Sequence, residues 1–265
     1  MTPANQPWSV NAYALKWIAI VTMVIDHAGY ACYKWLGFSE SYWLMRHIGR
    51  IAFPIFAFLL LEGFRHTRNR WAYLRNLLIF GLISEVPFDL LLTGWDRRDA
   101  SQNIFLTLSL GLFGVMMSET LFRRCETWRF PRPVSLFCAL LPMAAMVYAG
   151  DLLAVDYHLW GVLLIVLVYA GETVATFLFR DKASPQTLCN VGAAVGIVFW
   201  AALYDVSHGW VNELYGLVAL VPILLYNGER GRYRLSKWFF YGFYPAHLLI
   251  LYVFRDTVFK WLLAG

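Results

Sequence analysis

The sequence predicts an all-α polytopic integral membrane protein, with about nine transmembrane helices around a polar pocket and its N-terminus in the cytoplasm. Of its 265 residues 60% are hydrophobic, and the mean hydropathy is +0.54. Only 15% of the residues are charged, against about 25% in a soluble domain. A soluble fold of this size needs a more polar surface than these residues supply. Apolar runs of membrane-spanning length recur along the whole chain, with no linker that divides it into domains.

Each apolar run is about twenty residues long, which is enough for a helix to cross a bilayer. Together the runs form one transmembrane domain over residues 1–265, with the first span at about 13–33 and the last at about 237–255. Residues 237–263 form either one long helix broken near Pro245 or a span followed by an interfacial helix. The nine runs are centred near Thr22, Ile55, Phe80, Phe113, Leu141, Val166, Val198, Val218 and Leu248.

Lysine and arginine residues set the orientation, because loops rich in them stay on the cytoplasmic side. The segments after the second, fourth, sixth and eighth runs read GFRHTRNR, FRRCETWRFPR, FRDKASP and NGERGRYRLSK. With Lys16 and Arg75, that side collects about 15 of the 22 basic residues. The N-terminus is therefore expected in the cytoplasm and, with an odd number of spans, the C-terminus outside. Such short basic clusters indicate contact with lipid headgroups and not with nucleic acid.

The first run carries ionisable residues that a spanning helix does not need. Lys16 and His27 are eleven residues apart, which places them about 20° apart on one helix face and about 16 Å apart along its axis. Lys16 can extend to the headgroups, but Asp26 and His27 lie deeper. His27 is either a hydrogen-bonded core residue or a functional one, and intramembrane ionisable groups are functional by default. Asp26 points about 100° away from His27, and an ion pair with Arg46 or Arg50 fits it equally well.

Further polar residues gather toward the outer half of the predicted spans. Each charge at that depth costs roughly 2.5–3.5 kcal/mol, so these groups must face one another or water. They predict one outward-opening pocket, although the arginines and carboxylates among them also fit a purely structural role between helices. The residues are Asp26, Arg46, Arg50, Glu85, Asp89, Asn103, Asp151, Asp156, Tyr244 and His247.

Other kinds of site have no support in the sequence. No HxxxH, DxD or CxxC set with ligand spacing occurs, so no metal is expected. No glycine-rich phosphate loop precedes a helix. The four cysteines are spread along the chain and are expected to be free thiols. Glu62 lies three and four residues before Arg65 and His66, which predicts an ion pair at the surface.

From the first run to the last, the chain contains in order the segments LKWIAIVTMVIDHAGY, RHIGRIAFPIFAFLLLEGFRHTRN, FGLISEVPFDLLL, QNIFLTLSLG, DYHLWGVLLIVLVY and YGFYPAHLLILY. This ordered set resembles the TraX family, the conjugative-pilin acetylases. That family is similar to a wider superfamily of membrane acyltransferases, which includes polysaccharide O-acetyltransferases and the lysosomal heparan-glucosaminide N-acetyltransferase. A hallmark of the superfamily is a basic residue followed eleven positions later by a histidine on the first span. Lys16 and His27 match it, with Lys where Arg is more usual.

The resemblance implies an acyltransferase domain in the bacterial inner membrane. Acetyl-CoA is expected to enter from the cytoplasm, and its acetyl group to pass to an acceptor at the outer side, which for the TraX family is the N-terminal amine of processed pilin. Basic side chains are expected to attract the phosphates of CoA. The residues expected to contact this co-substrate are Lys16, Arg65, Arg68, Arg75 and Arg46.

The catalytic roles follow from the same resemblance and from the chemistry of acyl transfer. Neutral His27 is expected to accept the proton of the attacking amine as a general base. Arg50, Asn103, Tyr244 or His247 would donate to the developing oxyanion. The carboxylates would bind the acceptor ammonium or orient the arginines. Glu85, Asp89, Asp151 and Asp156 belong to this group, and Asp26 is counted with the catalytic residues. An acetyl-histidine intermediate is a second route.

Two other functions remain open at this stage. A sugar hydroxyl or amine is an alternative acceptor for the same architecture, and Trp95, Trp160 and Trp210 in the outer loops offer aromatic platforms for it. A proton-coupled transporter is an alternative from another class, because Asp, Glu and His within spans can relay protons. The absence of a visible internal repeat speaks against the transporter.

Overall fold

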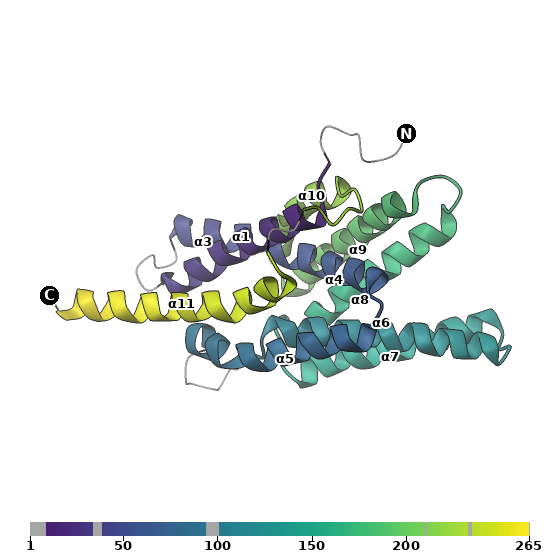
Figure 1. Ribbon diagram of the computed structural model, residues 1–265, viewed down its shortest axis with the longest axis horizontal. Coiled ribbons are helices and arrows are strands. Elements are labelled where there is room, and N and C mark those ends of the chain that lie inside the picture. Colours follow the sequence, from purple (N-terminus) through teal and green to yellow (C-terminus); the bar gives the residue numbers. More distant parts are fainter. Residues whose placement is uncertain (1–8, 34–38, 94–100, 210, 233–234, 265) are drawn as a thin grey trace.

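The computed structural model describes residues 9–33, 39–93, 101–209, 211–232 and 235–264, so Trp95 and Trp210 lie outside the described residues. The described residues are helical, and β-type pairing among them is confined to two isolated bridges, Val10 with Tyr226 and Gln102 with Val155. The helices lie roughly along one axis in an elongated bundle (Figure 1). In order they are α1 (Ala12–Ala31), α3 (Glu40–Gly49), α4 (Ala52–His66), α5 (Arg70–Phe88), η2 (Asp89–Thr93), α6 (Ile104–Thr127), α7 (Arg132–Leu152), α8 (His158–Leu178), α9 (Pro185–His208), η4 (Glu213–Ala219), α10 (Leu220–Leu224) and α11 (Lys237–Ala264).

Five helical segments in the described part of the chain are long and apolar enough to cross a membrane. They are Glu40–His66, Ile104–Thr127, Arg132–Leu152, His158–Leu178 and Pro185–His208. The predicted span near Val218 corresponds to the short pair η4 and α10, Glu213–Leu224, which is shorter than the roughly 20 residues that a helix needs to span a bilayer. The all-helical class and the membrane-length helices are confirmed, and the count of nine spans stays a prediction.

Several helices begin at residues whose side chains satisfy the free backbone N–H groups of the first turn. Asn11 accepts a hydrogen bond from the N–H of Ala14 at 3.0 Å, and Asn103 accepts one from Phe105 at 3.1 Å. Ser184 does the same for the first turn of α9, where Pro185 occupies the first helical position. These are the residue types that favour helix N-termini, so the sequence itself fixes where α1, α6 and α9 start.

Glycines allow α8 and α9 to approach until their backbones touch. A Cβ atom at Gly171 would lie 2.1 Å from the carbonyl oxygen of Gly192, and one at Gly192 would lie 2.4 Å from that of Gly171. One turn farther along α9, a Cβ at Gly196 would lie 2.4 Å from the carbonyl oxygen of Leu167. Small residues at such spacing are the usual means of close helix packing in membranes, where burial of apolar surface gives no driving force between helices.

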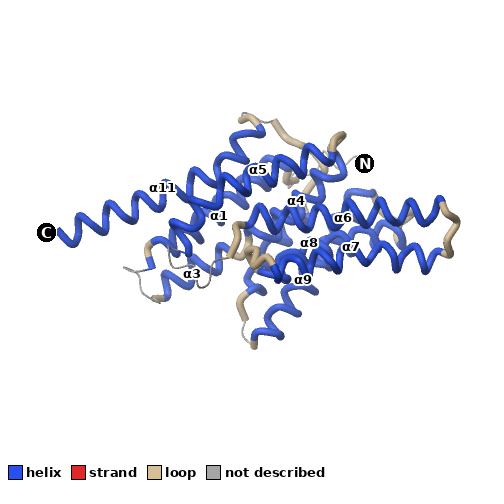
Figure 2. The backbone as a smooth tube through the Cα atoms, turned by 90° about the horizontal axis from the view of Figure 1, so that it is seen from below, coloured by secondary structure: helices blue, strands red, loops and turns tan. Residues whose placement is uncertain are grey.

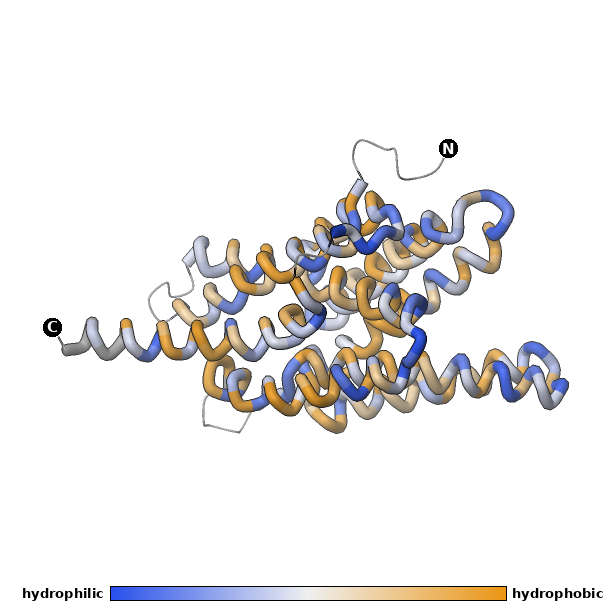
Figure 3. Tube along the Cα trace, viewed as in Figure 1, coloured by the Kyte–Doolittle hydropathy of each residue, from blue (hydrophilic) through white to orange (hydrophobic). Residues whose placement is uncertain are grey.

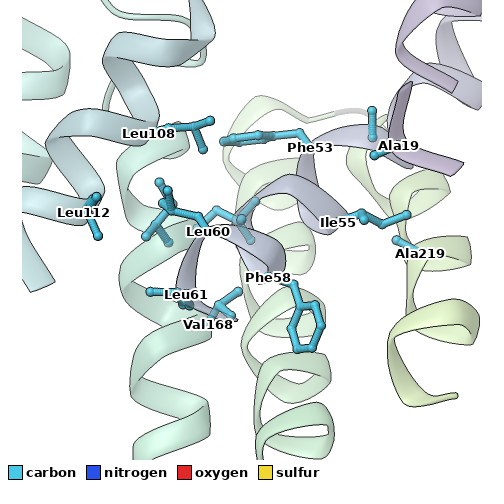
Figure 4. Close-up of a cluster of buried hydrophobic side chains, with 14 of the residues drawn as sticks. Ala19, Phe53, Ile55, Phe58, Leu60, Leu61, Leu108, Leu112, Val168 and Ala219 are labelled. Carbon is cyan, nitrogen blue, oxygen red and sulfur yellow. The ribbon is translucent and has the colours of Figure 1, made fainter. Parts of the chain in front are cut away.

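Helix α4 lies in the centre of the bundle and supplies much of its core (Figure 4). Ile55, Phe58 and Leu61 are fully buried on it. The ring of Phe58 meets Tyr226 edge to face, with 5.4 Å between centroids. The outer helices instead expose apolar side chains, such as Leu82 on α5, as expected for contact with lipid tails. Hydrophilic residues collect in the loops that join α4 to α5, α6 to α7 and α8 to α9 (Figure 3).

Helix α11 is continuous from Lys237 to Ala264, and its C-terminal part extends past the rest of the bundle (Figure 2). Residues 237–263 therefore belong to a single long helix, as in the first alternative, but the break expected near Pro245 does not occur. Arg255 anchors it by donating to the carbonyl oxygens of Leu91 and Leu90 at 2.8 and 2.9 Å. These carbonyls belong to η2, and carbonyl oxygens at the end of a helix have no N–H donor within the helix itself.

Candidate functional site

Two histidines from opposite ends of the chain meet inside the bundle. Nδ1 of His27 on α1 lies 2.8 Å from Nε2 of His247 on α11. The two rings are nearly parallel, with an interplanar angle of 6° and centroids 5.0 Å apart. The ring of Tyr244 meets both edge-on, at 6.2 Å from His27 and 5.5 Å from His247. The prediction grouped these three residues, and the structure brings them into direct contact.

Two adjoining cavities lead from one end of the bundle toward these histidines. The inner cavity, of about 300 Å³, is lined by Met23, Phe243 and Tyr244, which are the immediate neighbours of the histidine pair. The outer cavity, of about 430 Å³, opens among Ala12, Gly228 and other residues of the same end. Both are lined by the same five residues where they meet: Lys16, Leu59, Gly63, Thr67 and Lys237. The bundle thus contains a path from its end to Met23, about one helical turn before His27.

The mouth of this path is cationic, and we call this end of the bundle the basic end. Lys16, Arg230 and Lys237 line the outer cavity. Lys16 also lies over the ring of Phe240, with its Nζ 5.0 Å from the centroid. Because Lys16 and Met23 occupy successive levels of the inner cavity, the first helix forms one wall from the mouth to the histidines. The predicted shared face of Lys16 and His27 agrees with this layout.

The outer cavity is also lined by Glu62 and His66, which belong to a network of carboxylates around Arg65. Arg65 pairs with Glu62 at 2.5 Å and with Glu172 of α8. Glu62 also accepts from the hydroxyl of Tyr226 at 3.0 Å and pairs with His66 at 2.9 Å. Glu62 is only 5% exposed and Glu172 4%. The predicted pairs of Glu62 with Arg65 and His66 are confirmed, but the surface position expected for Glu62 is wrong, because its carboxylate is buried and also accepts from Tyr226, just after α10.

A second polar cluster lies at the opposite end, which we call the acidic end. Arg46 pairs with Asp26 at 2.9 Å, so the predicted ion pair is confirmed. Arg50 pairs with Glu213 at 3.1 Å and donates to the hydroxyl of Tyr157 at 2.6 Å. Among the described residues, no hydrogen-bond partner reaches Oδ1 of Asp26 or Oε2 of Glu213. The cluster therefore holds two buried carboxylate oxygens that receive no hydrogen bond within the described part of the chain.

The turn between α7 and α8 contributes to the acidic end. Tyr157 adopts a left-handed backbone conformation, with φ of 61°, that L-residues disfavour by roughly 1–2 kcal/mol. The strained turn is held where the Tyr157 hydroxyl meets Arg50 and where the carbonyl oxygen of Asp156 accepts from Thr107 at 2.9 Å. Burial raises the pKa of Asp156 to about 6, and the nearby Arg50 opposes that rise. Backbone strain of this kind is typical of functional sites.

Asn103 and Glu85 join α6 to α5. The Nδ2 group of Asn103 donates to the carboxylate of Glu85 and, at 2.8 Å, to the carbonyl oxygen of Gly81. Asn103 is fully buried and also caps α6, so its amide is occupied by the fold. Asp89 begins η2 at the end of α5. The roles predicted for Glu85, Asp89 and Asn103 in the reaction stay predictions.

The residues predicted to contact acetyl-CoA fall into four places. Lys16 lines both cavities, whereas Arg65 is engaged by two carboxylates and Arg46 lies at the acidic end. Arg68 and Arg75 are exposed at the basic end and line neither cavity. Among the described residues, no group of three or more His, Cys, Asp or Glu side chains is placed to hold a metal ion.

Sequence reasoning missed five residues that the structure places at these sites. A glutamate inside an apolar run is by itself a sign of a buried polar site, so Glu172 could have been predicted from the sequence. Tyr226 lies at the end of the eighth apolar run, and the other three lie in segments that were used only to assign loops or orientation. The five are Glu172, Glu213, Tyr226, Arg230 and Lys237.

Comparison with known proteins agrees with the ordered motifs. The chain is 28% identical over 257 residues to the probable fimbrial assembly protein FimC, serogroup H1, of Dichelobacter nodosus, an alignment that covers 91% of this chain and 94% of that protein. No solved structure matches the chain. The family described as TraX protein matches residues 11–255, which is nearly the whole chain. This protein therefore belongs to the TraX family.

Proposed function

We propose that this protein is a membrane acetyltransferase that moves the acetyl group of acetyl-CoA to the N-terminal amine of a pilin or similar peptide. One observation carries the proposal: a path with a cationic mouth leads through the bundle to the neighbours of a histidine pair. The name of the relative from Dichelobacter nodosus, a probable fimbrial assembly protein, supports a pilin as the acceptor.

The basic end suits the donor. By the lysine and arginine distribution this end faces the cytoplasm, where acetyl-CoA is made. The phosphates of CoA would lie at the mouth, against Lys16, Arg230 and Lys237, where ammonium and guanidinium groups form charge-assisted hydrogen bonds. The pantetheine arm would fill the inner cavity, which is lined mainly by apolar and aromatic side chains. The thioester then arrives beside Tyr244, next to the histidines.

The acidic end suits the acceptor. It faces away from the cytoplasm on this orientation, and it carries Asp26, Asp156 and Glu213 against the two cations Arg46 and Arg50. A peptide ammonium supplies a positive charge and N–H donors for the unpaired carboxylate oxygens. Attraction to the carboxylates would offset part of the cost of desolvating such a charge. The acceptor therefore reaches His27 from the side opposite to the donor.

The reaction needs one base and no cofactor beyond acetyl-CoA. The bound ammonium first releases one proton to water, and the neutral amine nitrogen then attacks the carbonyl carbon of the thioester, so that a C–N bond forms and the C–S bond breaks. His27 accepts the proton of the amine and returns it to the departing thiolate, so the products are the N-acetyl peptide and CoA with a free thiol. A general base in this position contributes about 10²–10⁴ in rate.

The test uses purified protein in lipid nanodiscs with labelled acetyl-CoA and a peptide that carries a pilin N-terminus. We expect the peptide to gain one acetyl group, and the same peptide with a blocked N-terminus to gain none. His27→Ala should lower kcat about 10²–10⁴-fold while acetyl-CoA still binds. Transfer at the wild-type rate by folded His27→Ala would refute the mechanism, and label on a glycan in place of the peptide would refute the acceptor.

Charge-removing variants of the mouth test the donor site separately. Arg230→Gln and Lys237→Gln should each raise KM for acetyl-CoA about tenfold, with kcat little changed, because each removes a contact to a charged phosphate. Arg68→Gln and Arg75→Gln are matched controls, since they remove the same charge at the same end but outside the cavities. Equal effects of all four variants would show that only the overall charge of this end matters.

A further inference from the structure

The histidine pair has a defined donor and acceptor at each nitrogen of His247. Its Nδ1 lies 3.0 Å from the carbonyl oxygen of Phe243, one helical turn earlier on α11. A carbonyl oxygen can only accept, so this nitrogen must carry the hydrogen. In a neutral imidazole the other nitrogen, Nε2, then has only its lone pair. The hydrogen bond of 2.8 Å to His27 must therefore be donated by Nδ1–H of His27.

The same reasoning fixes the protonation of His27. With the hydrogen on Nδ1, the lone pair of its neutral ring lies on Nε2. No hydrogen-bond partner of this Nε2 occurs among the residues that the structure describes, and the His27 side chain is only partly buried. We propose that His247 is a positioning residue that holds His27 as its Nδ1–H tautomer and thereby directs the basic Nε2 of His27 to the reacting amine. The catalytic part of this inference rests on the proposed function.

His247 is itself held rigidly enough to act in this way. It is 5% exposed. Phe243 stacks on its ring at 5.2 Å between centroids and 12° between planes, and Tyr244 meets it edge-on at 5.5 Å. With the ring clamped on two sides and its Nδ1 bound to the helix backbone, rotation about the Cβ–Cγ bond would break the hydrogen bond to Phe243. The carbonyl oxygen, His247 and His27 thus form one oriented chain of hydrogen bonds.

The chain of hydrogen bonds also favours the protonated intermediate. When Nε2 of His27 accepts the amine proton, the ring becomes a cation and its Nδ1–H becomes a stronger donor. The lone pair of His247 then receives a charge-assisted hydrogen bond, which is about twice as strong as a neutral one. This neutral acceptor plays the part that a carboxylate plays beside the histidine of a serine protease triad, where loss of the orienting partner lowers kcat by about 10⁴.

The test separates acceptor chemistry from packing. In His247→Gln the amide oxygen takes the place of Nε2 and can still accept from His27, whereas His247→Leu and the shorter His247→Asn leave His27 without an acceptor. We expect His247→Gln to keep kcat within about tenfold of wild type. His247→Leu and His247→Asn should lower kcat about 100-fold, with KM for acetyl-CoA within about threefold. His208→Gln is the matched control, since it changes an exposed histidine outside the site and should leave kcat unchanged.

A second measurement does not depend on acetyl transfer. Nitrogen-15 NMR of histidine-labelled protein in nanodiscs, assigned with the His27 and His247 variants, reports which ring nitrogen carries the hydrogen. We expect hydrogen on Nδ1 of His27 in the wild type and in His247→Gln, and a shift toward Nε2 in folded His247→Leu. Hydrogen on Nε2 of His27 in the wild type would overturn the inference, as would equal loss of kcat in the Gln and Leu variants. If no peptide is ever acetylated, the proposed function fails while the NMR result still decides the tautomer.

Discussion

Replacing Arg65 by Met tests whether this arginine is structural or binds acetyl-CoA. In the structure it is shared by Glu62 and Glu172, both about 5% exposed as side chains, and is itself 28% exposed. Removal of one partner from a buried ion pair costs about 3–5 kcal/mol, because the other charge stays buried and unpaired. Partial exposure of Arg65 places the expected loss at about 2–3 kcal/mol. At roughly 2–4 °C per kcal/mol, the thermal midpoint should fall by about 5–10 °C.

The double variant Arg65→Met/Glu172→Gln gives this test its second arm. It removes the carboxylate that the single change leaves unpaired, while Glu62 keeps its contacts to His66 and the hydroxyl of Tyr226. We expect it to regain most of the lost stability, with a coupling energy above about 1.5 kcal/mol in a double-mutant cycle. Thermal unfolding in nanodiscs and calorimetric titration with CoA are the assays.

The two readouts of the double variant lead to different conclusions. Unchanged CoA affinity in the stable double variant would assign Arg65 to the fold alone. A tenfold or greater loss of affinity would instead place its guanidinium against the donor, as the sequence predicted. An Arg65→Met protein as stable as the wild type would refute the reasoning from buried charge.

Three further predictions concern packing and pH. Gly49→Ala should lower the free energy of unfolding by about 1–3 kcal/mol, because the added Cβ would lie 2.3 Å from the carboxyl group of Asp26. The control is Gly242→Ala, which should be neutral or stabilising because no atom lies within 4 Å of its added Cβ. An equal loss of stability in both variants would contradict the predicted clash. Gly192→Ala should destabilise by a similar amount, since its Cβ would meet the α8 backbone, and an unchanged unfolding midpoint would show that the two helices can separate at little cost. Burial raises the pKa of Asp156 to about 6 from the 3.8 of a free side chain, so the folded state binds the proton more tightly than the unfolded state does. The free energy of unfolding of the wild type should then fall as pH rises from 4 to 6, and Asp156→Asn should lack this fall. The same dependence of unfolding on pH in the wild type and in Asp156→Asn would refute the raised pKa.

The helical architecture followed directly from the sequence, since hydropathy alone identifies segments that must satisfy their backbone hydrogen bonds internally. The centre predicted near Thr22 falls in α1 and the one near Val166 in α8. The structure near Val218 differs from the predicted span, because hydropathy does not show how many residues of an apolar stretch form a regular helix. There the chain forms a 3₁₀ segment followed by one short turn of α-helix, within an apolar stretch that reads like a full span.

The site was only partly predictable, for reasons of geometry. Periodicity placed Lys16 and His27 on one face of α1, and the structure puts Lys16 in the cavity that leads toward His27. Periodicity cannot tell which distant helix faces a given side chain, so the contact between His27 and His247, 220 residues apart, was beyond it. The setting of Glu62 was misjudged for the same reason, because Tyr226, which donates to Glu62, and Glu172, which pairs with Arg65, are remote in sequence.

The pairing of the first described residues with a late segment has a consequence for biosynthesis. The N–H of Val10 donates to the carbonyl oxygen of Leu225 at 2.9 Å, and the N–H of Asn227 donates to that of Val10 at 2.9 Å. Gly228, Arg230 and Lys237, which line the mouth, and His247 on α11, which contacts His27, are all translated late. At about 5–20 residues per second, the first helix waits on the order of 10–40 seconds in the membrane before they exist. A ribosome-bound chain that stops short of α11 therefore lacks the partner of His27, and on the proposed function acetyl transfer can begin only after α11 has packed against α1.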